Sequence, residues 1–285
     1  MEFPNEIEND FDANLSRVIK IFYAGINHRP EEIFAAAESS ADDDFYTKYL
    51  SSLFTAIESA LSLDPQAIEK TLIKVNEASS RVNSFRKKPS SWKSWIPGLP
   101  AKIDYDAFSD IECHAELVYA DLMVITAGCS AGKDLSSWVG ILNGAYCINV
   151  AHNCYQNCFS ILQNKTNWSS KMAKEHFESG VRLAIGCFDL MVSFVPSRFV
   201  KLVELAGFSG DRDFGLSQLK ASESLTNGSR WPASALILGG YNLFLEYTYG
   251  LAEPDLELVE KIAIKCETMF PEVSDFICEN CLTFY

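Results

Sequence analysis

The sequence has few basic residues for its length. It holds 24 Lys and Arg against 38 Asp and Glu, which gives a formal net charge of −14 over 285 residues. A chain this acidic repels phosphate groups, so nucleic-acid binding is excluded as a global property. Residues 65–110 are the exception, with 8 basic and 5 acidic side chains, and a local basic patch stays an open alternative there.

The sequence also lacks strand-like alternation of apolar and polar residues over any useful length, which excludes a fold built on sheets. Apolar residues instead recur every three or four positions, as along residues 11–26, and such spacing predicts amphipathic helices. Asp64 followed by Pro65 is typical of a helix start. A longer helix is expected over about 106–127, with its end at residues 128–132. We therefore predict an all-α fold of antiparallel helix pairs.

Motifs for catalysis or metal binding are missing as well. His152, Cys154 and Cys158 lie close in sequence, and Cys278 and Cys281 have the two-residue gap seen in zinc sites. Neither group has a partner pair at standard spacing. We predict no catalytic residue, no cofactor and no metal ion. The alternative is an enzyme whose helical active site no known motif describes, and it would need a deep pocket.

The sequence starts at Met1 without a secretory signal, and its nine cysteines are an odd number scattered through apolar segments. Both features favour reduced thiols and a cytoplasmic location. Two apolar stretches, Trp231–Leu245 and the segment around Val181–Phe208, are interpreted as buried helices. The alternative is that Trp231–Leu245 or the region Phe188–Phe208 associates peripherally with the mitochondrial outer membrane or a lipid-droplet surface.

The expected domain organisation is simple. Residues 1–9 are rich in acidic side chains, and we expect a disordered lead-in there. Residues 10–285 are expected to form a single helical-repeat domain. Within it, residues 86–103 combine prolines, serines and tryptophans. This loop would separate an N-terminal helical unit, 10–85, from the main helical block, 104–285.

The most specific stretch lies between residues 175 and 220. Apolar positions at helical spacing lead up to Pro196, which cannot continue a helix because it has no N–H group. A glycine-flanked string then precedes the next helix: Gly207, Phe208, Ser209, Gly210, Asp211 and Arg212. Glycine-rich backbone before a helix can bind anions, but Asp211 would repel them. We interpret the string as a turn in which Asp211 caps the following helix.

This string, together with the segment 188–193 before it and Gly215-Leu216 after it, closely resembles the signature of the tetratricopeptide repeat protein 39 family. Two weaker matches lie upstream in the right order: Phe85-Arg86-Lys87-Lys88, and His114-Ala115-Glu116 with Tyr119-Ala120. A third match, at residues 138–144, is degraded. The resemblance covers most of residues 10–285 and implies a tetratricopeptide-like α-solenoid. It also implies a short member, because family members usually continue into further C-terminal repeats.

The resemblance implies a non-enzymatic adaptor that binds other proteins, in a family tied to lipid homeostasis and to the clearance of protein inclusions. It assigns a structural role to the signature residues and to Pro196. It also makes His114 and Glu116 a packing and hydrogen-bonding feature between helices.

The candidates for partner contact come from the residues themselves. Tryptophan and arginine are enriched at interface hot spots, and a basic, tryptophan-containing segment carries both: Arg86, Lys87, Lys88, Trp92 and Trp95. The alternative is a solvated loop whose tryptophans fold back onto the helices.

Overall fold

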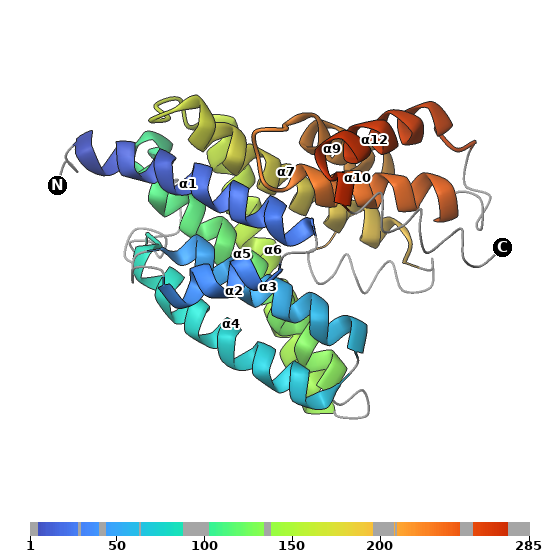
Figure 1. Cartoon of the computed structure of the whole chain (residues 1–285), viewed down its shortest axis with the longest axis horizontal. Helices are drawn as coiled ribbons and strands as arrows, with labels where there is room; N and C mark the ends of the chain where they lie inside the picture. Colours follow the sequence, from blue (N-terminus) through green and yellow to red (C-terminus); the bar gives the residue numbers. More distant parts are fainter. Residues whose placement is uncertain are drawn as a thin grey trace, which may run out of the picture. The chain divides into compact units, whose positions relative to one another are not determined.

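The structure is a computed structural model that describes residues 5–27, 30–39, 44–62, 64–87, 103–133, 138–195, 208, 210–245 and 253–272. Throughout these ranges the regular structure is helical and no strand is present, which confirms the all-α prediction. Figure 1 follows the helices along the chain. They are α1 Asn5–Ile26, α2 Pro30–Ser39, α3 Phe45–Ser62, α4 Pro65–Phe85, the 3-10 helix η1 Tyr105–Ala107, α5 Asp110–Lys133, α6 Trp138–Asn164, α7 Lys171–Ser193, α9 Arg212–Ser224, α10 Trp231–Gly240, the π-helix η2 Tyr241–Leu245 and α12 Leu256–Met269.

Helices that follow one another in the chain pack against one another. α3 contacts α4, α4 contacts α5 and α5 contacts α6. Further along, α9 packs on α10, and α10 packs on α12. Contacts between sequence neighbours are the organising feature of helical-repeat proteins, so the predicted α-solenoid of helix pairs is confirmed.

The chain divides into two compact units. The first unit consists of residues 1–15 and 36–177, and the second consists of residues 16–35 and 178–285. α1, α2 and α7 each contribute residues to both units.

The helices on either side of residues 86–103, α4 and α5, pack together within the first unit. α1 begins at Asn5, inside the segment 1–9 that we expected to be a lead-in.

Aspartates begin several helices, as their positions in the sequence predict. Asp64 accepts a hydrogen bond from the backbone N–H of Gln66 at 3.1 Å, and Pro65 occupies the first turn of α4. Asp211 does the same for α9 by accepting from the N–H of Phe214 at 3.0 Å. Each cap satisfies an N–H group that has no partner within its helix.

The expected helix end at residues 128–132 is wrong. α5 starts at Asp110 and continues through both glycines to Lys133. Glycine costs about 1 kcal/mol in a helix interior relative to alanine, and packing offsets that cost here. Gly132 faces the side chain of Ile68 in α4, where an added Cβ would lie 3.6 Å from Cδ1.

The core of the first unit is built around α5. Leu117, Val118 and Leu122 are fully buried, and α3, α4 and α6 all pack on this helix. From α3, Tyr46 and Leu50 are buried, whereas Ile57 and Leu61 in its second half are exposed.

The connection between α6 and α7 is fastened to η1. The carboxylate of Asp106 accepts hydrogen bonds from the N–H of Thr166 at 2.7 Å, its hydroxyl at 2.9 Å and the N–H of Asn167 at 3.2 Å. The buried ammonium of Lys165 donates to the carbonyl of Phe108 at 2.7 Å. It also lies 3.5 Å from the carboxylate of Asp110.

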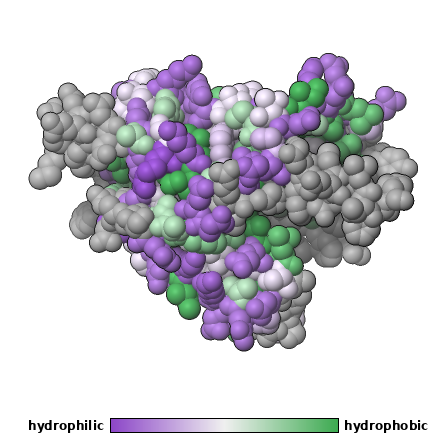
Figure 2. All heavy atoms as spheres, viewed as in Figure 1, coloured by the Kyte–Doolittle hydropathy of each residue, from purple (hydrophilic) through white to green (hydrophobic). Residues whose placement is uncertain are grey.

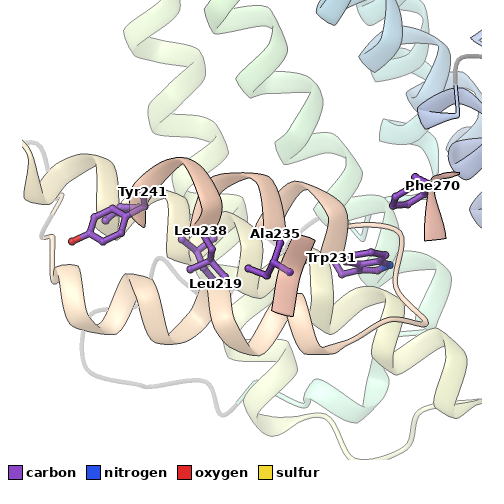
Figure 3. Close-up of a cluster of buried hydrophobic side chains, with 8 residues drawn as sticks. Leu219, Trp231, Ala235, Leu238, Tyr241 and Phe270 are labelled. Carbon is purple, nitrogen blue, oxygen red and sulfur yellow. The ribbon is translucent and has the colours of Figure 1, made fainter. Parts of the chain in front are cut away.

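The second unit has its own apolar core, shown in Figure 3. Trp231, Leu238 and Tyr241 line one side of α10 and η2, and Leu219 of α9 packs among them. The ring of Phe270 stacks on Trp231 with centroids 5.7 Å apart. The first half of the apolar stretch 231–245 is therefore a core helix, as predicted.

Candidate functional site

α6 contains no Asp, Glu, Lys or Arg in its 27 residues. One side of this helix packs on α5. Gly144 lies so close that an added Cβ would be 3.3 Å from the carbonyl oxygen of Ala127. Further along, the buried hydroxyl of Tyr155 donates to the carboxylate of Asp121 at 2.7 Å. Packing on α5 explains why one side of α6 is buried. It does not explain why the opposite side also carries apolar residues.

The opposite side of the N-terminal half of α6 is apolar and exposed to solvent. Five residues form it, each between 44 % and 78 % exposed: Trp138, Val139, Ile141, Leu142 and Tyr146. They fall within roughly 160° of the helix circumference at 3.6 residues per turn. We call these five residues the α6 face. A contiguous apolar patch of this kind is typical of a binding surface, whereas single exposed apolar residues are not.

The α6 face starts where α4 begins and α5 ends. The ammonium of Lys133 lies 3.8 Å from the carboxylate of Glu69, which brings the last turn of α5 beside the first turns of α4. The side-chain amide of Asn143 donates to the hydroxyl of Ser130 at 2.9 Å and fixes the start of α6 on α5. Figure 1 shows these helix ends together at the lower end of the first unit.

Sequence analysis missed this surface and treated residues 138–144 only as a degraded family match. The signal was present, because residues 135–164 form a run of 30 without Asp, Glu, Lys or Arg. Figure 2 shows that hydrophilic residues cover much of the described surface on the side in view.

The structure places Arg86 inside the first unit rather than on a free surface. Its Nε donates to the carboxylate of Glu116 at 2.7 Å, and its guanidinium lies 3.7 Å from the centroid of the Tyr119 ring. Its Nη2 also lies 3.5 Å from the sulfur of Cys154. Burial lowers the pKa of Arg86, but the hydrogen bond and charge of Glu116 outweigh it, and the net shift is upward.

These contacts bring two of the upstream family matches together. Arg86 follows α4, whereas Glu116 and Tyr119 lie on α5. Lys87 is likewise engaged. Its ammonium donates to the carbonyl of Ala107 at 2.5 Å and lies 4.4 Å from the centroid of the Phe108 ring. The other interaction candidates, Lys88, Trp92 and Trp95, lie outside the described residues.

His114 is fully buried in a cluster of aromatic and imidazole rings. Its Nε2 lies 3.0 Å from the carbonyl oxygen of Ala173, which can only accept, so Nε2 is the donor. Nδ1 of the same ring lies 2.5 Å from the hydroxyl of Tyr46. His176 stacks on His114 with ring centroids 5.6 Å apart. The cluster joins α3, α5 and α7 and has the features of a packing node.

The described part of the signature forms a corner between α7 and α9. The ring of Phe208 stacks on Phe188 with centroids 6.3 Å apart. A Cβ on Gly210 would lie 2.6 Å from the backbone nitrogen of Ser193, so only glycine fits. The N–H of Asp211 donates to the carboxylate of Asp189 at 3.2 Å.

Two carboxylates, from Asp189 and Asp211, thus occupy this corner, and they would repel an anion. Arg212 begins α9. Pro196, Gly207 and Ser209 lie outside the described residues.

Candidate metal ligands do not converge in the described ranges, where no three side chains of His, Cys, Asp or Glu are placed to hold an ion. Burial raises the pKa of the Cys113 and Cys154 thiols to about 12. A thiol of this kind is a poor nucleophile and a poor ligand because both roles need the thiolate. Cys278 and Cys281 lie outside the described residues.

Among the helices that the structure describes, none combines the length and the apolar character that crossing a bilayer requires. In the stretch 231–245 that was considered for surface association, Trp231 and Leu238 are fully buried. Leu236, Leu243 and Phe244 are exposed. One side of this segment is therefore buried, as predicted, whereas the other side is exposed.

Comparison with known proteins agrees with the resemblance in the signature. The model of the Iml2/Tetratricopeptide repeat protein 39 family matches residues 27–280. Tetratricopeptide repeat protein ttc-39B of Caenorhabditis elegans is 30% identical over 208 residues, which are 72% of this chain and 35% of that relative. The chain thus spans about a third of the relative's length. No solved structure matches the chain significantly. Because the family model covers nearly the whole chain, this protein belongs to the Iml2/Tetratricopeptide repeat protein 39 family.

Proposed function

We propose that this protein is a non-enzymatic scaffold that binds other proteins, and that the α6 face is its contact surface. The observation that carries the proposal is the apolar exposure of Trp138, Val139, Leu142 and Tyr146 on a helix without charged residues. An apolar centre without charged groups is typical of the core of a protein–protein interface. Membership of a tetratricopeptide repeat family supports the same role.

A non-enzymatic role is supported by the way the polar groups of the first unit are used. The hydroxyl of Tyr46 and the ring nitrogens of His114 bond to each other and to backbone. Arg86 and Glu116 pair with each other. These groups stabilise helix packing within the described part of the first unit.

The finer parts of the proposal rest on the residue types of the sequence or on the family resemblance. They are a cytoplasmic location, a link to lipid homeostasis or inclusion clearance, and a second contact segment formed by Lys88, Trp92 and Trp95. Nucleic acid is not proposed as a partner because of the net charge of −14.

The proposal is tested with a double variant of the α6 face, Trp138→Ser with Leu142→Ser. Tagged wild-type and variant proteins are expressed in their native cells, and captured proteins are quantified by mass spectrometry. Because both side chains are mostly exposed, the variant is expected to fold normally while losing its partners. The matched control is Ile264→Ser, which removes an exposed apolar side chain from α12. Unchanged partners in the double variant would contradict the proposal.

Peripheral membrane association is the second candidate function. It is favoured by Leu236, Leu243 and Phe244, which are exposed on α10 and η2, since exposed apolar side chains can enter the boundary between headgroups and acyl chains. The test is flotation with vesicles of zwitterionic lipid, which the acidic chain does not repel. Binding that is lost in Phe244→Ser but kept in Ile264→Ser would support this function, whereas a protein that never floats excludes it.

A further inference from the structure

We infer that the partner on the α6 face is a second copy of this chain, joined by antiparallel packing of the two α6 helices about Leu142. The inference rests on the proposed function, since it uses the same surface, and it goes further by naming the occupant. Three properties of the surface carry it: the even spacing of three of its residues, its lack of charge and its area.

Three residues of the α6 face are evenly spaced about Leu142. Leu142 lies four residues after Trp138 and four residues before Tyr146, so about 6 Å of helix separates it from each. When two such helices cross antiparallel about a twofold axis at Leu142, residue 142 meets its own copy. Trp138 of each copy then meets Tyr146 of the other. Closed dimers are built from self-complementary patches of this kind, in which residue i contacts j and j contacts i.

The aromatic residues at the two ends of the α6 face also suit this pairing. Trp138 and Tyr146 would form two aromatic pairs at the ends of the contact, with a leucine pair between them. Aromatic pairs are favourable beyond the apolar area that they bury. The two flanking residues Val139 and Ile141 lie on opposite edges of the face and enlarge the apolar area around this axis.

The lack of charged residues on α6 lets two copies meet there in spite of the acidic chain. The chain carries a net charge of −14, so two copies repel each other wherever charged surfaces meet. α6 avoids this repulsion because it has no charged residue. α12, in contrast, exposes Leu256 and Ile264 beside Glu257 and Glu260.

The size of the face is sufficient for a weak or moderate dimer. The five residues are each between 44 % and 78 % exposed, and burying most of this area in both copies would approach about 1,200 Å², the lower end for specific interfaces. We therefore expect a dimer in reversible equilibrium with the monomer.

The first test is analytical ultracentrifugation of the full chain, the variant Leu142→Asp and the control Ile264→Asp. The wild type and the control are expected to form the same dimer. Leu142→Asp should weaken it by about tenfold or more, because a carboxylate would be buried without a partner. Raising the salt concentration from about 0.01 M to about 1 M should strengthen the wild-type dimer. The Debye length falls from about 30 Å to about 3 Å over this range, so the charges of the two copies repel each other less.

The second test determines the antiparallel register by cysteine cross-linking. Leu142→Cys is expected to link to its own copy on mild oxidation. Trp138→Cys and Tyr146→Cys should each link poorly alone but efficiently when the two variants are mixed. The wild-type chain, with its nine cysteines, sets the background, and Ile264→Cys is the control for an exposed thiol outside the face.

The outcomes separate this inference from the proposed function. A monomer at every concentration, with partner capture that depends on Trp138 and Leu142, would overturn the second copy and leave the scaffold function in place. A dimer that persists in Leu142→Asp would overturn the inference because the contact would lie elsewhere. If neither dimerisation nor capture responds to changes in the α6 face, both proposals are wrong.

Discussion

Gly186 of α7 and Gly215 of α9 lie against each other at a helix crossing that has no room for a side chain. A Cβ added to Gly186 would lie 2.8 Å from the carbonyl oxygen of Gly215. A Cβ added to Gly215 would lie 2.9 Å from the carbonyl oxygen of Gly186. Both atoms that would be met are backbone, so the helices themselves would have to move apart.

We predict that Gly186→Ala destabilises the protein by about 1–3 kcal/mol, the usual cost of overpacking. The matched control is Gly239→Ala in α10, where an added Cβ meets nothing within 4 Å. That change should leave stability unchanged or raise it by about 0.5–1 kcal/mol, because alanine loses less entropy in a helix. Urea denaturation followed by circular dichroism measures both. Equal effects at the two positions would show that the crossing tolerates a side chain.

The pair formed by Arg86 and Glu116 supports a second prediction. Both side chains are mostly buried, and removing one partner leaves the other desolvated. Glu116→Gln should therefore cost about 1.5–3 kcal/mol, the range for hydrogen bonds to charged groups. Lys261→Gln, which breaks an exposed pair with Glu257 on α12, should cost much less because solvent screens that pair. Thermal unfolding of both variants checks the difference, and a similar loss in both would contradict it.

The same pair shows what sequence reasoning can and cannot find. Asp64, Asp211 and Asp255 cap helices through hydrogen bonds to residues two or three positions away, and such local chemistry is readable in one sequence. The partner of Arg86 is 30 residues away. Tertiary packing decides the environment of Arg86, and the sequence does not show which residue it meets. The sequence therefore suggested only that Arg86 contacts a partner.

Packing explains the two other differences as well. Gly128 and Gly132 suggested a helix end, yet α5 continues because its contacts outweigh the cost of glycine. The α6 face escaped notice because exposure depends on which side of α6 meets α5. The family signature could be recognised in the sequence. It includes positions with close backbone contacts, such as Gly210, where only glycine fits.

Acid should loosen the connection between α6 and α7 through Asp106. Hydrogen bonds from the backbone and side chain of Thr166 lower the pKa of this carboxyl, and the N–H of Asn167 adds to the effect. A depressed pKa contributes stability above the unfolded-state value of about 3.9. That contribution is lost as the pH falls through the lower folded-state pKa.

The variant Asp106→Asn tests this contribution. Its melting temperature should lie below that of the wild type at neutral pH, and the gap should narrow as the pH falls below about 4. Glu267→Gln, a change at an exposed position on α12, serves as the control and should show no such narrowing. A gap between Asp106→Asn and the wild type that stays constant from neutral to acid pH would mean that the carboxylate charge is not responsible.

α10 provides the sharpest comparison between a core residue and a surface residue of the same type. Leu238 is 0 % exposed in the core of the second unit, whereas Leu236, two residues earlier, is 77 % exposed. Leu238→Ala should cost about 2–5 kcal/mol, since it removes buried methyl groups and leaves a cavity. Leu236→Ala should change stability by less than about 0.5 kcal/mol. Denaturant titration of the two variants measures this difference. If α10 instead lay on a membrane through Leu236, that variant alone would lose vesicle binding, so the pair of variants separates a role in folding from a role in binding.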